Sequence, residues 1–274
     1  MIRLILRHLV VFLFYTLGVS VALLMLPPLQ GLALGLLLLW LLLRFYLLPS
    51  TPEGPEDMRP ARRLQALRLR PLRGEVLRWT LVALPVMLVL SWSVGELYVS
   101  LVPVPAETFN PFGPLIGDPW GQLAITVLAV VAAPVAEEFF FRGVIQHPLE
   151  QRWGAAAGIL GAAALFALVH LLPWVFPLHF FLGAVFGWVV YTTRSIWSGV
   201  IFHAGNNALA VLGLGAGEDP LTRPTLWEVG LDADWWLAMG VLVVSLAAAI
   251  RVAGHLRSAA RREEAAASPH ALQV

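Results

Sequence analysis

Two adjacent carboxylates and an arginine stand inside a long apolar stretch of this sequence. Glu137 and Glu138 are followed by three phenylalanines and then by Arg142. Residues four apart lie on one face of a helix, so Glu138 and Arg142 can form an ion pair. Glu137 projects about 100° around the helix and can face a different neighbour. This pattern predicts one neutralised carboxylate and one available as a general base, with a purely structural ion pair as the alternative.

Two later apolar stretches carry polar groups at the spacing of one helical turn. His170 follows Phe166 by four residues, and Asn207 follows His203 by four. The second pair therefore presents an imidazole and an amide on one helical face. Each pair also has a structural alternative, because a lone buried histidine is commonly a packed residue and His and Asn often join membrane helices by hydrogen bonds.

Taken together, these groups indicate one site. Ionisable groups in a hydrocarbon layer are costly and mark function by default. If the three stretches converge, a water between Glu137 and the two histidines, His170 and His203, has a base and orienting donors. Asn207 could then stabilise an oxyanion. This constellation is typical of a hydrolase.

Composition indicates what holds these residues. Apolar residues make up 59% and charged residues 13% of the 274-residue chain, and the mean hydropathy is +0.78. Soluble domains are about half apolar and a quarter charged. A membrane-spanning helix needs about 20 apolar residues, and the sequence predicts an all-α, polytopic membrane bundle of about eight such helices. The predicted spans are Leu4–Leu26, Gly31–Leu48, Trp79–Val102, Gly121–Gln146, Ala155–Leu172, Leu178–Thr193, Trp197–Gly215 and Trp235–Ala253.

Charge distribution predicts the orientation. All 18 basic residues are arginines, and those in the predicted loops gather on one side of the spans, with Arg223 as the only base on the other. That other side carries Glu107, Asp118, Glu218, Asp219, Glu228, Asp232 and Asp234. The positive-inside rule then places both termini in the cytoplasm, in a multi-pass protein of the cytoplasmic (inner) membrane. The first apolar run is too long for a cleaved signal peptide. We expect one transmembrane domain over residues 1–256 and a disordered cytoplasmic tail over 257–274.

The arginine-rich connector over residues 59–78 has two interpretations. It alternates leucines with its charges, which favours a short amphipathic helix on the cytoplasmic leaflet. Its prolines favour a solvated loop instead. The chain has no cysteine, which excludes disulfides, thiolate nucleophiles and Cys-ligated metals.

The order Glu-Glu-x-x-x-Arg, Phe-x-x-x-His, His-x-x-x-Asn resembles the three motifs of the CPBP family. That group, also called ABI, comprises type II CAAX prenyl endopeptidases, bacteriocin-processing and immunity proteins, and relatives. The resemblance covers residues 121–215. It implies an intramembrane peptidase that hydrolyses a membrane-associated substrate. The position of His203, about 9 Å from Trp197 at the cytoplasmic start of its span, favours a cavity open toward the cytoplasm. The roles it implies are water activation by Glu137, holding of water or oxyanion by His170, His203 and Asn207, and shaping of the site or substrate contact by Glu138, Arg142 and Phe166.

Other functions are less well supported by the residues. The chain contains no His-Glu-x-x-His and no Gly-x-Ser-Gly, and Asp118 has no second membrane aspartate to form a dyad. A non-catalytic scaffold or immunity protein could keep the same residues. A proton-coupled transporter would need polar groups along a whole pathway, and the first, second and last spans offer none. The expected partners are the lipid bilayer and a membrane-associated peptide or protein, with no nucleic acid.

The need for a metal is open at this point. Glu137, His170 and His203 could form a two-His, one-carboxylate zinc site with water as the fourth ligand. Arg142 nearby would oppose a cation, so metal-free activation of water is equally good chemistry.

Helix geometry sets one condition on the site. At about 1.5 Å per residue, straight spans would leave Glu137 near the inner side and His170 near the outer side. We therefore expect the helix of Glu137 to continue toward Leu149 and residues 155–161 to extend below the hydrocarbon.

Overall fold

The computed structural model describes residues 2–47, 67–105, 115, 117–215 and 225–267. Regular secondary structure in these ranges is helical, apart from one isolated β-bridge between Leu69 and Ser195. The all-α prediction is therefore confirmed. The helical segments are, in chain order, α1 (Ile2–Met25), α2 (Pro28–Leu41), η1 (Leu42–Leu47), α4 (Gly74–Leu101), α6 (Pro119–Thr126), η4 (Val127–Ala132), α7 (Ala133–Glu138), η5 (Phe139–Gln146), α8 (His147–Trp153), α9 (Ala155–Val169), η6 (Pro173–Val175), α10 (Phe176–Thr193), α11 (Ile196–Gly215), α12 (Leu226–Val229) and α13 (Ala233–Ala267).

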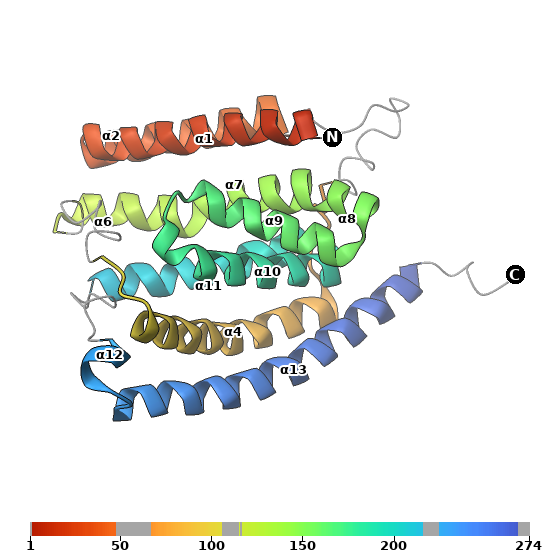
Figure 1. The fold of residues 1–274 in the computed structure, drawn as a ribbon. Helices are drawn as coiled ribbons and strands as arrows, with labels where there is room; N and C mark the ends of the chain where they lie inside the picture. The colour runs from red at the N-terminus through yellow and green to blue at the C-terminus, as the bar shows by residue number, and fades with distance from the viewer. Residues whose placement is uncertain (1, 48–66, 106–114, 116, 216–224, 268–274) are drawn as a thin grey trace, which may run out of the picture.

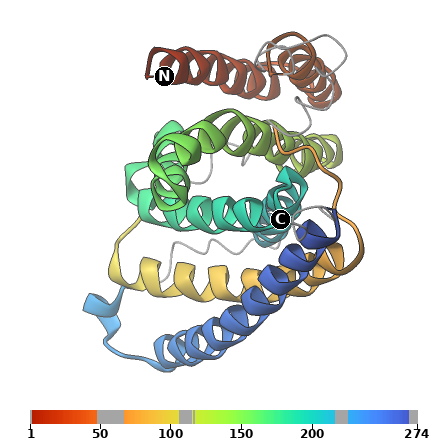
Figure 2. The same ribbon diagram turned by 90° about the vertical axis from the view of Figure 1, so that its right-hand side faces the viewer.

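The helices form three layers. The α1–α2 hairpin lies on one side, the group from α6 to α11 occupies the middle, and α4 packs with α13 on the other side (Figures 1 and 2). Successive long helices alternate in direction (Figure 1). The first residues of α1 and the last of α13 consequently lie at the same end of the bundle. We call this the arginine end, because it holds Arg68, Arg152 and Arg194.

Six described segments are long and apolar enough to cross a membrane, so the chain is an integral, multi-pass membrane protein. The helix α9 is apolar but has only 15 residues. The helix α11 carries His203, Asn206 and Asn207, which lower its hydropathy, and it is not among the six. The count of eight spans stays a prediction. The six segments are Ile5–Met25, Pro28–Tyr46, Gly74–Leu101, Pro119–Trp153, Pro173–Thr193 and Ala233–Ala266.

The span Pro119–Trp153 contains two wide helical turns. The π-helical segments η4 and η5 each end two residues before a proline, Pro134 and Pro148 respectively. A proline inside a helix lacks an N–H, and its ring clashes with the carbonyl four residues earlier. A π-turn, which bonds residues five apart, relieves that clash. The short segment α7 with the acidic pair therefore stands between two wide turns.

The lengths of two helices bring Glu137 and His170 toward the same depth in the bundle. The 35-residue span Pro119–Trp153 continues past Leu149, as expected. At about 1.5 Å per residue, α9 rises only about 22 Å. The turn after α9 therefore stops short of those ends of α6 and α11 that lie opposite the arginine end (Figure 1), and Val175 beyond it is fully buried. The position of residues 155–161 relative to the hydrocarbon stays a prediction.

The described part of the arginine-rich connector is docked onto the bundle. Residues 67–73 are not helical, so the amphipathic-helix interpretation is wrong for them, whereas Pro71 and Arg73 are exposed, as the loop interpretation expects. Residues 74–78 begin α4, and residues 59–66 lie outside the described ranges. Leu67 and Arg68 are buried. The Ile196 N–H donates to the carbonyl of Arg68 at 2.9 Å, and the Ser195 hydroxyl donates to the carbonyl of Arg70 at 2.5 Å.

The last helix also differs from the expected tail. The structure describes α13 as one helix to Ala267, so residues 257–267 are helical; residues 268–274 lie outside the described ranges. Leu256, Ala259 and Ala260 are buried. Ion pairs join Glu263 to Arg70 and Glu264 to Arg194, the latter at 3.6 Å. Packing and charge pairing at the arginine end thus extend the helix.

We predict that the buried ion pair between Arg68 and Glu150 stabilises the arginine end. Their side chains are 2% and 7% exposed, and Arg68 Nη1 donates to Glu150 Oε1 at 3.1 Å. The substitution Arg68→Met leaves a buried carboxylate without its partner, which costs about 3–5 kcal/mol. Thermal unfolding in detergent measures the loss. Arg78→Met is the control, because the Arg78–Glu75 pair is 62% and 50% exposed and worth about 0–1 kcal/mol. Equal shifts in the two variants would contradict the prediction.

Candidate active site

The predicted ion pair between Glu138 and Arg142 is present and fully buried. Arg142 Nε lies 3.2 Å from Glu138 Oε2, and both side chains are 0% exposed. Arg142 Nη2 also donates to the carbonyl of Gly183 in α10 at 3.3 Å. Its guanidinium lies 5.1 Å from the centroid of the Phe166 ring, a cation–π distance. The arginine thus joins η5 to α9 and α10.

His203 lies between the two adjacent carboxylates. Its Nδ1 is 3.2 Å from Glu138 Oε1, and its Nε2 is 3.8 Å from Glu137 Oε2. The first distance is a hydrogen bond in which Nδ1–H donates to the carboxylate; the second is too long for one. Glu137 Oε2 is buried and accepts no hydrogen bond from the protein. Glu138 is thus paired with Arg142 as well as with His203, whereas Glu137 faces His203.

Aromatic rings position the histidines. The Phe166 ring centroid lies 4.7 Å from that of His170 and 5.6 Å from that of His203. Phe186 stacks on His203 at 5.0 Å. His170 Nδ1–H donates to the Phe166 carbonyl at 2.7 Å, which fixes the tautomer and leaves Nε2 as an acceptor. The Phe166 ring therefore lies between His170 and His203 and contacts both.

Asn207, expected to stabilise an oxyanion, bonds to a main-chain carbonyl. Its Nδ2–H donates to the main-chain carbonyl of Ala129 in η4 at 2.8 Å. The amide therefore contacts the helix of the glutamates two turns away from Glu137. This contact gives no support to its predicted role as an oxyanion donor.

Gly199 leaves space for the central carboxylate. A Cβ at this position of α11 would collide with Glu138 Oε2 and would lie 2.7 Å from Val190 Cγ2. A larger residue would push Glu138 away from both Arg142 and His203. The glycine is thus part of the geometry of the site.

Three residues near the site were missed by the sequence analysis. The His179 ring lies 4.1 Å from that of His170, and Gln146 is fully buried with its Nε2 donating to the Gly187 carbonyl at 2.9 Å. Tyr15 of α1 lies within electrostatic range of Glu137. The position of His179 in an apolar span was a usable signal. Nothing in the sequence distinguishes Tyr15 from other aromatic residues of a membrane helix.

A zinc site would need three ligand side chains around one position. Among the residues that the structure describes, no three His, Asp or Glu side chains could hold one metal ion. Glu137 Oε2 and His203 Nε2 face each other at 3.8 Å, but these two groups form no three-ligand cluster with His170.

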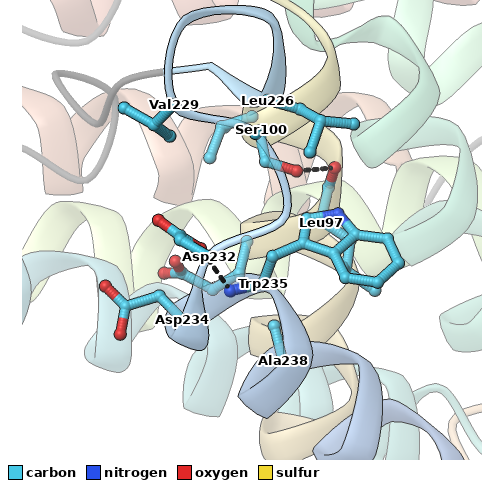
Figure 3. Close-up of a pocket in the computed structure, with 11 residues that line it drawn as sticks. Leu97, Ser100, Leu226, Val229, Asp232, Asp234, Trp235 and Ala238 are labelled. Carbon is cyan, nitrogen blue, oxygen red and sulfur yellow. Dashed lines mark hydrogen bonds between the residues drawn. The ribbon is translucent and has the colours of Figure 1, made fainter.

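A separate cavity of about 210 Å³ lies between α4, α12 and α13, at the end of the bundle opposite the arginine end (Figure 3). Its lining includes Glu96, Asp232, Asp234 and Trp235. Asp232 Oδ1 accepts a hydrogen bond from the Trp235 N–H at 2.8 Å, at the start of α13. Carboxylates are favourable at a helix N-terminus. This cavity is distinct from the glutamate–histidine site.

Fold and site together define a multi-pass helical membrane protein with buried glutamate, histidine and arginine side chains on converging helices. Residues 119–209 match the family model described as type II CAAX prenyl endopeptidase Rce1-like. This match confirms the resemblance that the motifs predicted, and the matched segment contains all three of them. No curated protein and no solved structure matches the chain.

We predict that Gly199→Ala impairs the site without unfolding the chain. The new methyl group displaces Glu138, so His203 loses the acceptor that orients it. Activity should fall by roughly 10-fold or more, because small misplacements of catalytic groups are costly. Gly213→Ala on the same helix is the control, since its Cβ meets nothing within 4 Å. Comparable activity in both variants, with both folded, would show that the space at Gly199 is unimportant.

Proposed function

We propose that this chain is an intramembrane endopeptidase that uses Glu137 to activate water. The observation that carries the proposal is the buried Glu137 Oε2, which has no protein donor and faces His203 Nε2 at 3.8 Å. Arg142 lies beside Glu138, and the Glu138 carboxylate accepts the hydrogen bond that orients His203. The match to a protease family supports hydrolysis as the reaction.

The proposed chemistry needs only protein side chains and water. One water can donate one hydrogen to Glu137 Oε2 and the other to His203 Nε2, because the two acceptors are 3.8 Å apart. Glu137 takes a proton as the water oxygen bonds to the substrate carbonyl carbon. The C–N bond then breaks, and the proton on Glu137 passes to the departing amine. The orienting hydrogen bond from His203 to Glu138 parallels the carboxylate–histidine pair of serine hydrolases.

The other residues position substrate and base in this proposal. His170 presents a free Nε2, which can accept an N–H of the substrate main chain. Phe166 separates the two imidazoles and packs against Arg142. The substrate is a membrane-associated peptide or protein, since the site lies inside the bundle.

We further propose that both termini are cytoplasmic and that the site opens toward the arginine end. His203 lies only about 10 Å from the first residues of α11, at about 1.5 Å per residue. Reporter fusions after Arg194 should therefore read cytoplasmic, and fusions near Asp232 should read external. A cytoplasmic signal at Asp232 would contradict this orientation.

We predict that Glu137→Gln abolishes cleavage while leaving the chain folded. The amide keeps the shape of the side chain and removes the proton acceptor, so the rate should fall by roughly 10²–10⁴-fold. A library of membrane-anchored peptides, incubated with parent and variant, measures the loss. Glu75→Gln is the control, since this carboxylate is half exposed at the start of α4.

Other outcomes of this experiment point to other functions. Cleavage that survives in Glu137→Gln would reject the proposed base. Preserved cellular function in the same variant would indicate a non-catalytic scaffold or immunity protein, and loss of pH-dependent uptake without peptide products would indicate a transporter. Cleavage by the parent that persists after exhaustive chelation would rule against a required, removable metal.

A further inference from the structure

The π-helical turn before the acidic pair leaves one carbonyl without a donor from its own helix. The Ala133 N–H bonds to the carbonyl of Leu128, five residues earlier, rather than to that of Ala129. The next residue that could serve Ala129 in a π-turn is Pro134, which has no N–H. The Ala129 carbonyl therefore receives neither its α-helical nor its π-helical hydrogen bond.

A side chain from another helix supplies the missing donor. Asn207 Nδ2–H reaches the Ala129 carbonyl at 2.8 Å. The helix α11 runs antiparallel to the span Pro119–Trp153 (Figure 1). The same two helices are therefore joined at two levels, by Asn207 with Ala129 and by His203 with the two carboxylates. Asn207 and His203 are four residues apart on α11, so a shift of α11 along its axis would change both contacts.

We propose that Pro134 is a positioning residue that acts through Asn207. By withholding its N–H it frees the Ala129 carbonyl, and the Asn207 bond to that carbonyl sets the axial register of α11 against α7. The register in turn sets the distance from His203 to Glu137 and Glu138. The expected effect on peptide cleavage rests on the proposed peptidase function, whereas the expected effect on the helix register does not.

The substitution Pro134→Ala separates this role from a merely structural one. Alanine restores the N–H and removes the ring clash, so the helix can close on its own carbonyls and no longer needs Asn207. The thermal midpoint should stay the same or rise. Peptide cleavage should fall by roughly 10²-fold, as expected for a shift of about 1 Å at the site. A residue needed only for folding would instead lower both.

The register can be measured without a substrate, because the chain has no cysteine. Spin labels at Trp153→Cys in α8 and Leu209→Cys in α11, both exposed positions, report the offset of the two helices. In Pro134→Ala and in Asn207→Ala the distance distribution should shift, by about 1.5 Å per residue of slip, or broaden. The double variant should change no further, because both residues act through one hydrogen bond. Pro85→Ala, an exposed proline inside α4, is the control and should leave the distances unchanged.

Each result decides the proposal. Unchanged distances in Pro134→Ala, or additive changes in the double variant, would overturn it. Changed distances with unimpaired cleavage would overturn the catalytic role of the register. If the parent cleaves no peptide, the peptidase function fails, and the distances still decide whether Pro134 and Asn207 set the register.

Discussion

A buried carboxylate in a membrane bundle is costly unless partners lie within hydrogen-bond reach. Glu138, with no exposed surface, meets this requirement by contacting Arg142 on its own helix and His203 on α11. Arg142 in turn bonds to the backbone of α10 and stacks on Phe166 of α9. Through the carboxylate and its arginine, the five helical segments α7, η5, α9, α10 and α11 are joined.

The same requirement explains why this part of the bundle is tightly packed. Partners can meet a buried charge only if the helices approach closely, and glycines permit that approach. A Cβ at Gly183 would lie 3.1 Å from Ala163 Cα, and one at Gly199 would collide with Glu138. The neighbouring rings of Phe166 and Phe186 fill the remaining space around His203. Within this packing, Glu137 retains a buried oxygen that the protein does not bond.

The sequence predicted those features that depend on local spacing and composition. The pair of Glu138 and Arg142 follows from residues four apart, and the helical stretches follow from runs of apolar residues. The sequence also predicted that Glu137 and His203 converge, but not the partner of each polar atom, because no local pattern specifies it. Glu137 shares His203 with its neighbour, and Asn207 bonds to Ala129 because a proline-linked π-turn exposes that carbonyl. The signal for that turn, Pro134 three residues before the acidic pair, was present in the sequence.

The docked connector has a consequence for how the protein is made. Arg68 and its partner Glu150 are separated by 82 residues, and Arg70 and Ser195 by 125. Chains emerge from the ribosome at about 5–20 residues per second, so Arg68 waits roughly 4–16 s before Glu150 has been synthesised. The arginine end can close only after α11 has begun to emerge. Assembly of this end is therefore a late event in biogenesis, because residues 68 and 70 are made well before their partners.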